Sequence, residues 1–133
     1  MLRNAIVCFA MGTVLLSGCL VNIHREDGLP KTELLRHVVL FKFKDSSSRE
    51  DIKEVEDAFR ALPGKIDAIY DFEWGTDVSV ENRQQGFTHC FFVTFISEDD
   101  RAIYLPHPAH KEFGQILGPH LDKVLVIDYW SKE

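Results

Sequence analysis

The run FTHCFFVTFI, residues 87–96, is apolar on both faces of the strand that it predicts. Its aromatic and β-branched residues favour a strand, in which successive side chains point to opposite faces of the sheet. Apolar side chains therefore line both faces: Phe87, Phe91, Val93 and Phe95 on one, and Cys90, Phe92 and Ile96 on the other. The run VLVIDYW, residues 124–130, is apolar on both faces in the same way. The chain must therefore fold into a sheet whose two faces are both covered.

The remaining patterns place helices and further strands around these two runs. Strands are predicted over residues 35–44, 68–78, 87–96 and 123–130, and helices from Ser47 or Ser48 to near Leu62, over 98–105, and from Pro108 to Gly118. With the two short helices taken as one layer, the order is β-α-β-β-α-β. This order predicts an α+β, ferredoxin-like protomer, in which an antiparallel four-stranded sheet carries helices on one face.

Helices on one face leave the second apolar face of the sheet without a cover. We expect a second copy of the chain to cover it across a two-fold axis, which makes the protein a homodimer. The contact is expected through Phe92, Ile96, Leu125 and Ile127, or through their opposite-face neighbours.

The first 18 residues have the pattern of an export signal. A positive charge at Arg3 precedes an apolar run over residues 5–16, which is too short to span a membrane as a stable helix. The ending Leu-Ser-Gly-Cys resembles a bacterial lipobox, so we expect a lipoprotein signal peptide over residues 1–18 and a lipid such as palmitate on Cys19. A plain signal peptide with an incidental cysteine is the alternative.

The lipobox interpretation predicts both the segments of the chain and the location of the protein in the cell. Residues 19–33 become a lipidated tether, and residues 34–131 form the folded domain. We expect a protein of the bacterial cell envelope that is held to the membrane by its lipid anchor only, on the periplasmic or extracellular side. Leu20 in place of an aspartate suits the outer membrane of a Gram-negative cell.

Charge and cysteine content exclude two further classes of function. The net charge of −6 leaves no basic stripe for a nucleic acid. After loss of the signal peptide and lipidation of Cys19, Cys90 is the single remaining thiol, so no internal disulfide forms. Its apolar surroundings in sequence predict a small buried side chain rather than a nucleophile.

The segment YLPHPAH, residues 104–110, is the strongest candidate for a site. Pro108 starts a helix, so His110 lies in the first turn, where the helix dipole disfavours a charged imidazole. A neutral His110 accepts a proton, and the hydroxyl of Tyr104 holds a carbonyl or enolate oxygen, as enolisation and aldol steps require. We therefore predict Tyr104 and His110 as catalytic residues.

The same histidines also have structural interpretations. His107 would cap the helix and His110 would bond to the backbone, while His89 would be a buried core or interface histidine. His107 and His110 have an H-x-x-H spacing, but no carboxylate or thiolate clusters near them in sequence, so no metal is expected.

Five motifs together resemble the stress-responsive dimeric α/β-barrel (Dabb) family. They are RHVVLFKFK, WGTDVS, GFTHCFFVTF, YLPHPAHKEF and VLVIDYW, in family order over residues 34–130. The resemblance implies a ferredoxin-like protomer whose sheet pairs with that of a partner to form a barrel. A plant polyketide cyclase of the family has a tyrosine–histidine pair that matches Tyr104 and His110, and a pocket histidine that matches His37. It uses neither metal nor organic cofactor.

The pocket wall is expected to differ from that of the cyclase. Val55 and Glu56 stand where the cyclase has larger aromatic residues, and Phe87 replaces a tyrosine. Substrate contacts are expected from His37, Val39, Phe41, Phe59 and His107.

Two classes of function follow. The first is a cofactor-free cyclase or lyase that acts on a small carbonyl or aromatic compound in a small apolar pocket. The alternative is a non-catalytic, stress-associated binding or scaffold protein.

Overall fold

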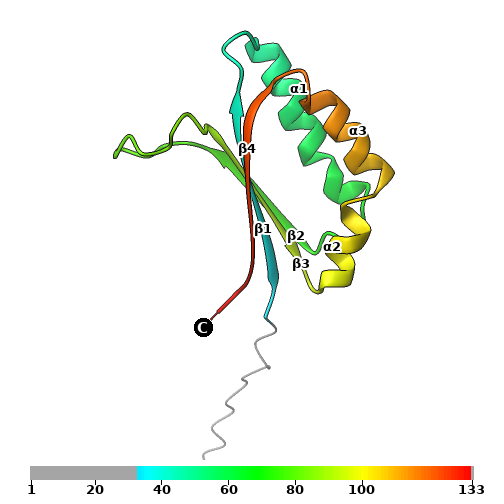
Figure 1. Ribbon diagram of the computed structural model, residues 1–133. Helices are drawn as coiled ribbons and strands as arrows, with labels where there is room; N and C mark the ends of the chain where they lie inside the picture. The colour runs from blue at the N-terminus through cyan, green and yellow to red at the C-terminus, as the bar shows by residue number, and fades with distance from the viewer. Residues whose placement is uncertain (1–32, 133) are drawn as a thin grey trace, which may run out of the picture.

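The computed structural model describes residues 33–132, which form one sheet and one helical layer (Figure 1). The predicted signal peptide, the lipidation site and all but the end of the tether lie outside these residues. In chain order the elements are β1 (Leu35–Phe43), α1 (Arg49–Arg60), β2 (Asp71–Thr76), β3 (His89–Phe95), α2 (Glu98–Tyr104), α3 (Pro108–Leu117) and β4 (Leu121–Trp130). A 3-10 turn, Leu62–Gly64, follows α1.

The sheet is antiparallel, with strand order β2-β3-β1-β4. The helices all lie on one side of it, as Figure 1 shows with the sheet seen nearly edge-on. This confirms the predicted ferredoxin-like α+β fold. The strands differ in extent from the prediction: β2 and β3 are shorter than residues 68–78 and 87–96, β1 ends one residue earlier at Phe43, and β4 begins at Leu121. A turn at Ile66–Ile69 precedes β2.

Side-chain caps fix where the helices begin. Ser48 caps α1 and Ser97 caps α2, each in a reciprocal capping box with an aspartate three residues later. At α3, Pro108 occupies the first turn and the His107 side chain accepts a hydrogen bond from the backbone N–H of Ala109. A lost cap typically costs about 1 kcal/mol of stability.

The core lies between the odd-numbered face of β1 and β3 and the helices. Phe59 of α1 stacks on Phe91 of β3 with ring centroids 4.2 Å apart, and it meets Phe113 of α3 edge-on at 4.7 Å. Each fully buried aromatic side chain contributes about 1.5–3 kcal/mol through its transfer from water. These aromatic contacts join both helices to the centre of the sheet.

The even-numbered face has no helix over it. Val38 is paired with Phe92 on one side and with Ile127 on the other, so the three side chains share this open face. Leu40 is likewise paired with Cys90 and Leu125. The structure thus decides which apolar face the helices leave uncovered. Cys90 lies on this open face and is half-buried, rather than in the core.

None of the helices described in residues 33–132 is both long and apolar enough to cross a membrane.

Candidate functional site

A cavity of about 250 Å³ lies between the helical layer and the sheet on the β4 side of the fold. Polar side chains enter it from three elements: His37 from β1, Tyr104 from α2 and His110 from α3. The rest of the wall is apolar, apart from one glycine: Val39, Phe41, Phe59, Leu105, Phe113, Gly114, Leu117, Val124 and Val126. A mostly apolar pocket with a few converging polar groups is the usual form of a small-molecule site.

Tyr104 is almost completely buried at the C-terminal end of α2. Its ring packs against Phe95, with centroids 5.2 Å apart, and against His110, with centroids 4.4 Å apart. Burial alone raises the pKa of the phenol far above its ordinary value, with no hydrogen bond from the described residues contributing. Tyr104 therefore stays protonated and its hydroxyl is a donor.

His110 sits in the first turn of α3 and is fixed by one hydrogen bond. Its Nδ1 lies 3.0 Å from the carbonyl oxygen of Leu105. Because a carbonyl only accepts, Nδ1 must carry the proton, which leaves Nε2 as the basic nitrogen of the neutral ring. Desolvation, followed by the nearby His37 and His107, lowers the pKa of His110 below 6.5, although the bond to Leu105 acts in the opposite direction. The ring is therefore neutral at pH 7 and able to accept a proton.

His37 is oriented by a carboxylate that sequence reasoning did not find. Its Nδ1 lies 2.6 Å from Oδ1 of Asp128 on β4, and Oδ2 of the same carboxylate accepts from Nη1 of Arg101 at 3.0 Å. The His37 side chain is buried, and its ring meets the Tyr104 ring edge-on at 5.7 Å. With Nδ1 bound to Asp128, Nε2 is the ring nitrogen left for the cavity.

The buried polar groups of this cavity are not sealed off. Gln84 Oε1 is the one buried side-chain nitrogen or oxygen in residues 33–132 that has no hydrogen-bond partner. Nε2 of His37, Nε2 of His110 and the Tyr104 hydroxyl are therefore open to the cavity, since none of them is bonded to another group of that range. These three groups can bind and exchange protons with a ligand.

Most of the predicted site residues come together here. His37, Val39, Phe41, Phe59, Tyr104 and His110 all line the cavity. His107 does not: its Nδ1 is used in capping α3, which matches the structural interpretation of that residue. The backbone bond of His110 also matches its structural interpretation, but that bond fixes the proton on Nδ1 rather than blocking Nε2.

Asp128 and Arg101 gave no usable signal in the sequence. Asp128 lies 91 residues after His37 in the sequence, and Arg101 lies 27 residues before Asp128. Only sheet pairing and helix packing bring these side chains together. The pairing of His37 with Asp128 across β1 and β4 could have been found only once the strand register was known.

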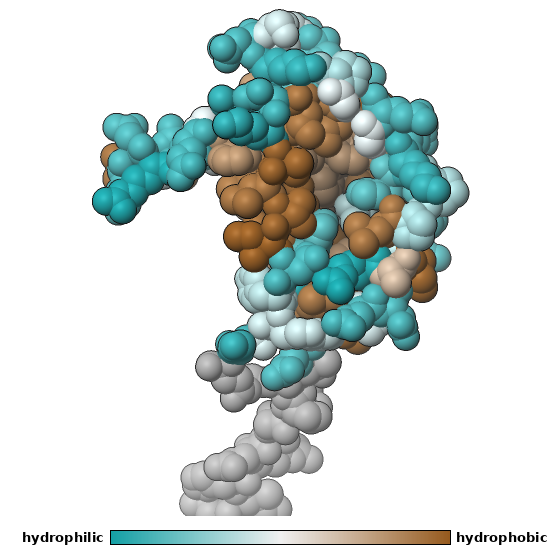
Figure 2. All heavy atoms as spheres, viewed as in Figure 1, coloured by the Kyte–Doolittle hydropathy of each residue, from teal (hydrophilic) through white to brown (hydrophobic). Residues whose placement is uncertain are grey.

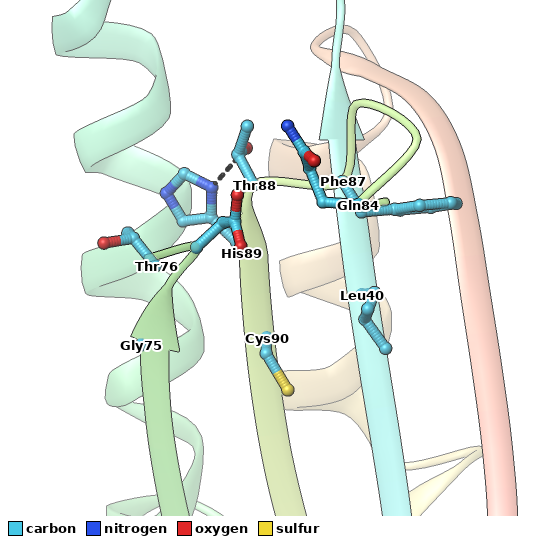
Figure 3. A pocket seen from close by; sticks show the side chains of 9 residues that line it. Leu40, Gly75, Thr76, Gln84, Phe87, Thr88, His89 and Cys90 are labelled. Atoms are coloured by element: carbon cyan, nitrogen blue, oxygen red, sulfur yellow. Dashed lines mark hydrogen bonds between the residues drawn. The ribbon is translucent and has the colours of Figure 1, made fainter. Parts of the chain in front are cut away.

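A second pocket, of about 240 Å³, lies where the connection between β2 and β3 leaves the sheet (Figure 3). Leu40, Phe87 and Cys90 line it together with His89. Both nitrogens of the buried His89 are engaged: Nδ1 lies 2.8 Å from Oγ1 of Thr88, drawn as a dashed line in Figure 3, and Nε2 lies 3.0 Å from Oε1 of Glu56. Burial raises the pKa of the Cys90 thiol, with a further contribution from Glu73, so it is not an activated nucleophile.

No three His, Cys, Asp or Glu side chains form a metal-binding group within residues 33–132.

Fold and site together define a ferredoxin-like protein with a mostly apolar cavity, lined by two histidines and a tyrosine, under its helices. Residues 35–131 match the family model described as the stress responsive A/B barrel domain, Dabb. The chain belongs to this family.

Two curated relatives and two solved structures illustrate the likeness. The Arabidopsis thaliana stress-response A/B barrel domain-containing protein HS1 is 48% identical over 71% of this chain and 87% of its own. Olivetolic acid cyclase of Cannabis sativa is 35% identical over 74% of this chain and 98% of its own. The hydroxynitrile lyase of Passiflora edulis superposes with a TM-score of 0.72 at 30% identity, covering 77% of this chain and 96% of its own. A dimeric ferredoxin-like protein of unknown function from Bacteroides fragilis superposes with a TM-score of 0.61 at 28% identity, covering 74% and 96%.

Proposed function

We propose that this protein binds a small carbonyl or aromatic compound in the Tyr104–His110 cavity and performs cofactor-free acid–base chemistry on it, of the cyclase or lyase type. The observation that carries this proposal is the meeting of one phenol donor and two imidazole nitrogens in a single apolar cavity. Two relatives support it, because one is named a cyclase and the other a hydroxynitrile lyase.

The chemistry needs one proton transfer and one stabilised oxyanion. His110 Nε2 takes a proton from the carbon next to a carbonyl, and the electrons of that C–H bond move to the carbonyl oxygen. The buried hydroxyl of Tyr104 donates to this oxygen as its charge develops. In a hydroxynitrile, the same base would take the hydroxyl proton while the bond to the cyanide carbon breaks and a carbonyl forms. Cyanide then leaves with the bonding pair.

The test uses proton exchange at the α-carbon of small aromatic ketones, together with cleavage of small aromatic hydroxynitriles. We expect His110→Gln and Tyr104→Phe each to lower the rate by roughly 10²–10⁴-fold, the usual size of a general acid or base contribution. His107→Asn is the matched control, because it removes an imidazole outside the cavity and keeps a side-chain cap on α3. It should retain the wild-type rate.

Thermal melts of the same variants separate catalysis from a scaffold role. If His110→Gln and Tyr104→Phe both destabilise the protein by about 1–3 kcal/mol, as loss of a needed buried bond would, and no tested compound reacts, the non-catalytic scaffold function replaces the enzyme.

We further propose that the protein is a homodimer whose two sheets meet through their open faces. The apolar side chains of this face, among them Phe92, Leu125 and Ile127, support this assembly, as does the dimeric Bacteroides fragilis relative. Light scattering should show twice the mass of the chain at micromolar concentration. A monomer under these conditions would exclude the dimer.

The lipobox pattern supports a last proposal, that Cys19 carries a lipid and holds the domain at a bacterial cell envelope. Globomycin, which blocks lipoprotein signal cleavage, should cause the precursor to accumulate. If Cys19→Ser is processed and released like the wild type, the lipid anchor is wrong and a plain signal peptide takes its place.

A further inference from the structure

The outer wall of the Tyr104–His110 cavity is half open to solvent at β4. Val124 and Val126 line the cavity, yet 49% and 46% of their surfaces are exposed. They are paired with Phe41 and Val39 of β1 and so lie on the helix side of the sheet. β4 is the edge strand, and none of the helices reaches over it. Figure 2 shows apolar atoms gathered along this edge.

The proposed packing of two open faces cannot cover this wall. Sheet-on-sheet packing buries the side chains that point to the open face, such as Leu125 and Ile127. Val124 and Val126 point the other way, so only a segment that passes around the edge of the sheet can reach them. A long, apolar edge strand without a cover is also a site of unspecific strand pairing, which proteins generally avoid.

The connection between β2 and β3, residues 77–88, projects from the sheet. We call it the arm. Figure 1 shows it extending away from the helices, on the side of the open face. Its base is held by hydrogen bonds from the Asp77 N–H to the Thr88 carbonyl at 2.8 Å and from the Thr88 N–H to the Phe41 carbonyl at 3.0 Å. Gly86, with φ of +84°, takes the left-handed turn that closes it.

The arm carries the two most exposed large apolar side chains of residues 33–132. Val78 is 89% exposed and Val80 is 93% exposed. They stand two positions apart, with Ser79 between them, in a stretch without regular secondary structure, so both are available to one surface of a partner. An isolated protomer therefore has two unburied valines on the arm and two half-buried valines on β4.

We propose that in the homodimer the arm of each copy passes around the β4 edge of the other and lays Val78 and Val80 against Val124 and Val126. The outer wall of each cavity is then supplied by the partner. A two-fold axis makes the contact reciprocal, so two arms close two cavities. This inference rests on the proposed homodimer but not on the proposed catalysis. It makes ligand binding and dimerisation mutually reinforcing, because the ligand site is complete only in the dimer.

The direct test is a filtered methyl NOE experiment on the full-length chain, with isotope-labelled and unlabelled copies mixed so that only contacts between copies are seen. We expect cross-peaks from the methyl groups of Val78 and Val80 to those of Val124 and Val126. A dimer without these cross-peaks overturns the inference and leaves the dimer intact. Contacts to β4 from residues 19–33 would also overturn it, whereas a monomer overturns the dimer itself.

A second test measures what the arm does to the site of the other copy. Wild-type chain with labelled histidines is mixed with an excess of unlabelled Val78→Asp, Val80→Asp chain. Desolvation already lowers the pKa of His110 in the single protomer. A partner arm that covers the cavity should lower this pKa further, so losing the arm should raise the pKa of the labelled His110. Ser79→Asp is the matched control: it adds a charge to the arm, leaves both valines in place and should have no effect.

The labels are then reversed, with labelled variant in an excess of unlabelled wild-type chain. If His110 of the labelled wild type does not respond but His110 of the labelled variant does, the arm acts within its own chain and the inference is wrong. If the charged arm prevents mixed dimers, the NOE result on the wild-type chain decides.

Discussion

Two buried histidines on the same face of the sheet differ in whether their second ring nitrogen is engaged. His37 and His89 are 6% and 8% exposed, and each is bonded to a carboxylate, Asp128 at 2.6 Å and Glu56 at 3.0 Å. His89 also uses its second nitrogen, on Thr88. The second nitrogen of His37 opens onto the cavity instead. The carboxylate partner is common to both, so the free second nitrogen is what distinguishes His37 from His89.

The largest expected difference between the two sites is in activity. His37→Gln should lower the rate of proton exchange on aromatic ketones by about 10²-fold, at the low end of the range for a single acid or base, because it removes a polar group that faces the reacting atoms. Glutamine can still donate to Asp128, so the fold is kept. His89→Gln is the matched control, and its rate should stay at the wild-type level. Equal losses of rate in the two variants would mean that the free nitrogen of His37 gives it no role that His89 lacks.

For stability, we expect the loss of His89 to have a clear effect even though the loss of His89 leaves the rate unchanged. His89→Ala leaves the partly buried carboxylate of Glu56 and the hydroxyl of Thr88 without a partner, and we expect a loss of about 1–3 kcal/mol in the free energy of unfolding. Urea denaturation measures it. His89→Ala together with Glu56→Leu removes both partners and should recover part of the loss. If His89→Ala leaves the free energy of unfolding unchanged, the His89–Glu56 pair does not stabilise the fold.

Gly114 gives a smaller effect that belongs to the cavity alone. A Cβ at this helical position would meet nothing within 4 Å, because the position borders the cavity. Gly114→Ala should therefore raise the free energy of unfolding by about 0.5–1 kcal/mol, through helix propensity, while it narrows the cavity. If Gly114→Ala lowers the free energy of unfolding instead, the added methyl group meets another group, and the cavity next to Gly114 is not empty in the native protein.

The pH dependence of stability should carry the signature of His110. Its pKa is lowered in the folded state, so the unfolded chain binds more protons once the pH falls below about 6.5. Stability contributed by neutral His110 is present above that pH and is lost as the pH falls from 6.5 toward the lower folded-state pKa. Urea midpoints of the wild type and of His110→Gln, measured above and below 6.5, should diverge in favour of the variant on acidification. Parallel curves would mean that His110 is not desolvated.

The sequence predicted the fold well because the signals for its elements are local. Capping serines, the Pro108 start of α3 and the alternation in the strands all act within a few residues. Tyr104 and His110 were accessible for the same reason, since they occupy one short motif. Asp128, Arg101 and Glu56 were not, because their partners lie on other elements and only the strand register and helix packing bring them together. Which apolar face the helices cover also depends on that packing.

We infer that His37 and His110 each direct a free Nε2 into one cavity, with His110 as a neutral ring, while both ring nitrogens of His89 are engaged. Long-range proton–nitrogen NMR of the imidazoles at neutral pH reports the tautomer of each ring directly. We predict a proton on Nδ1 of both His37 and His110, with His110 as the neutral Nδ1–H tautomer, and shifts of these two signals, but not of His89, when acetophenone is added. An Nε2–H tautomer or a charged ring at His110, or equal shifts in all three histidines, would contradict the account.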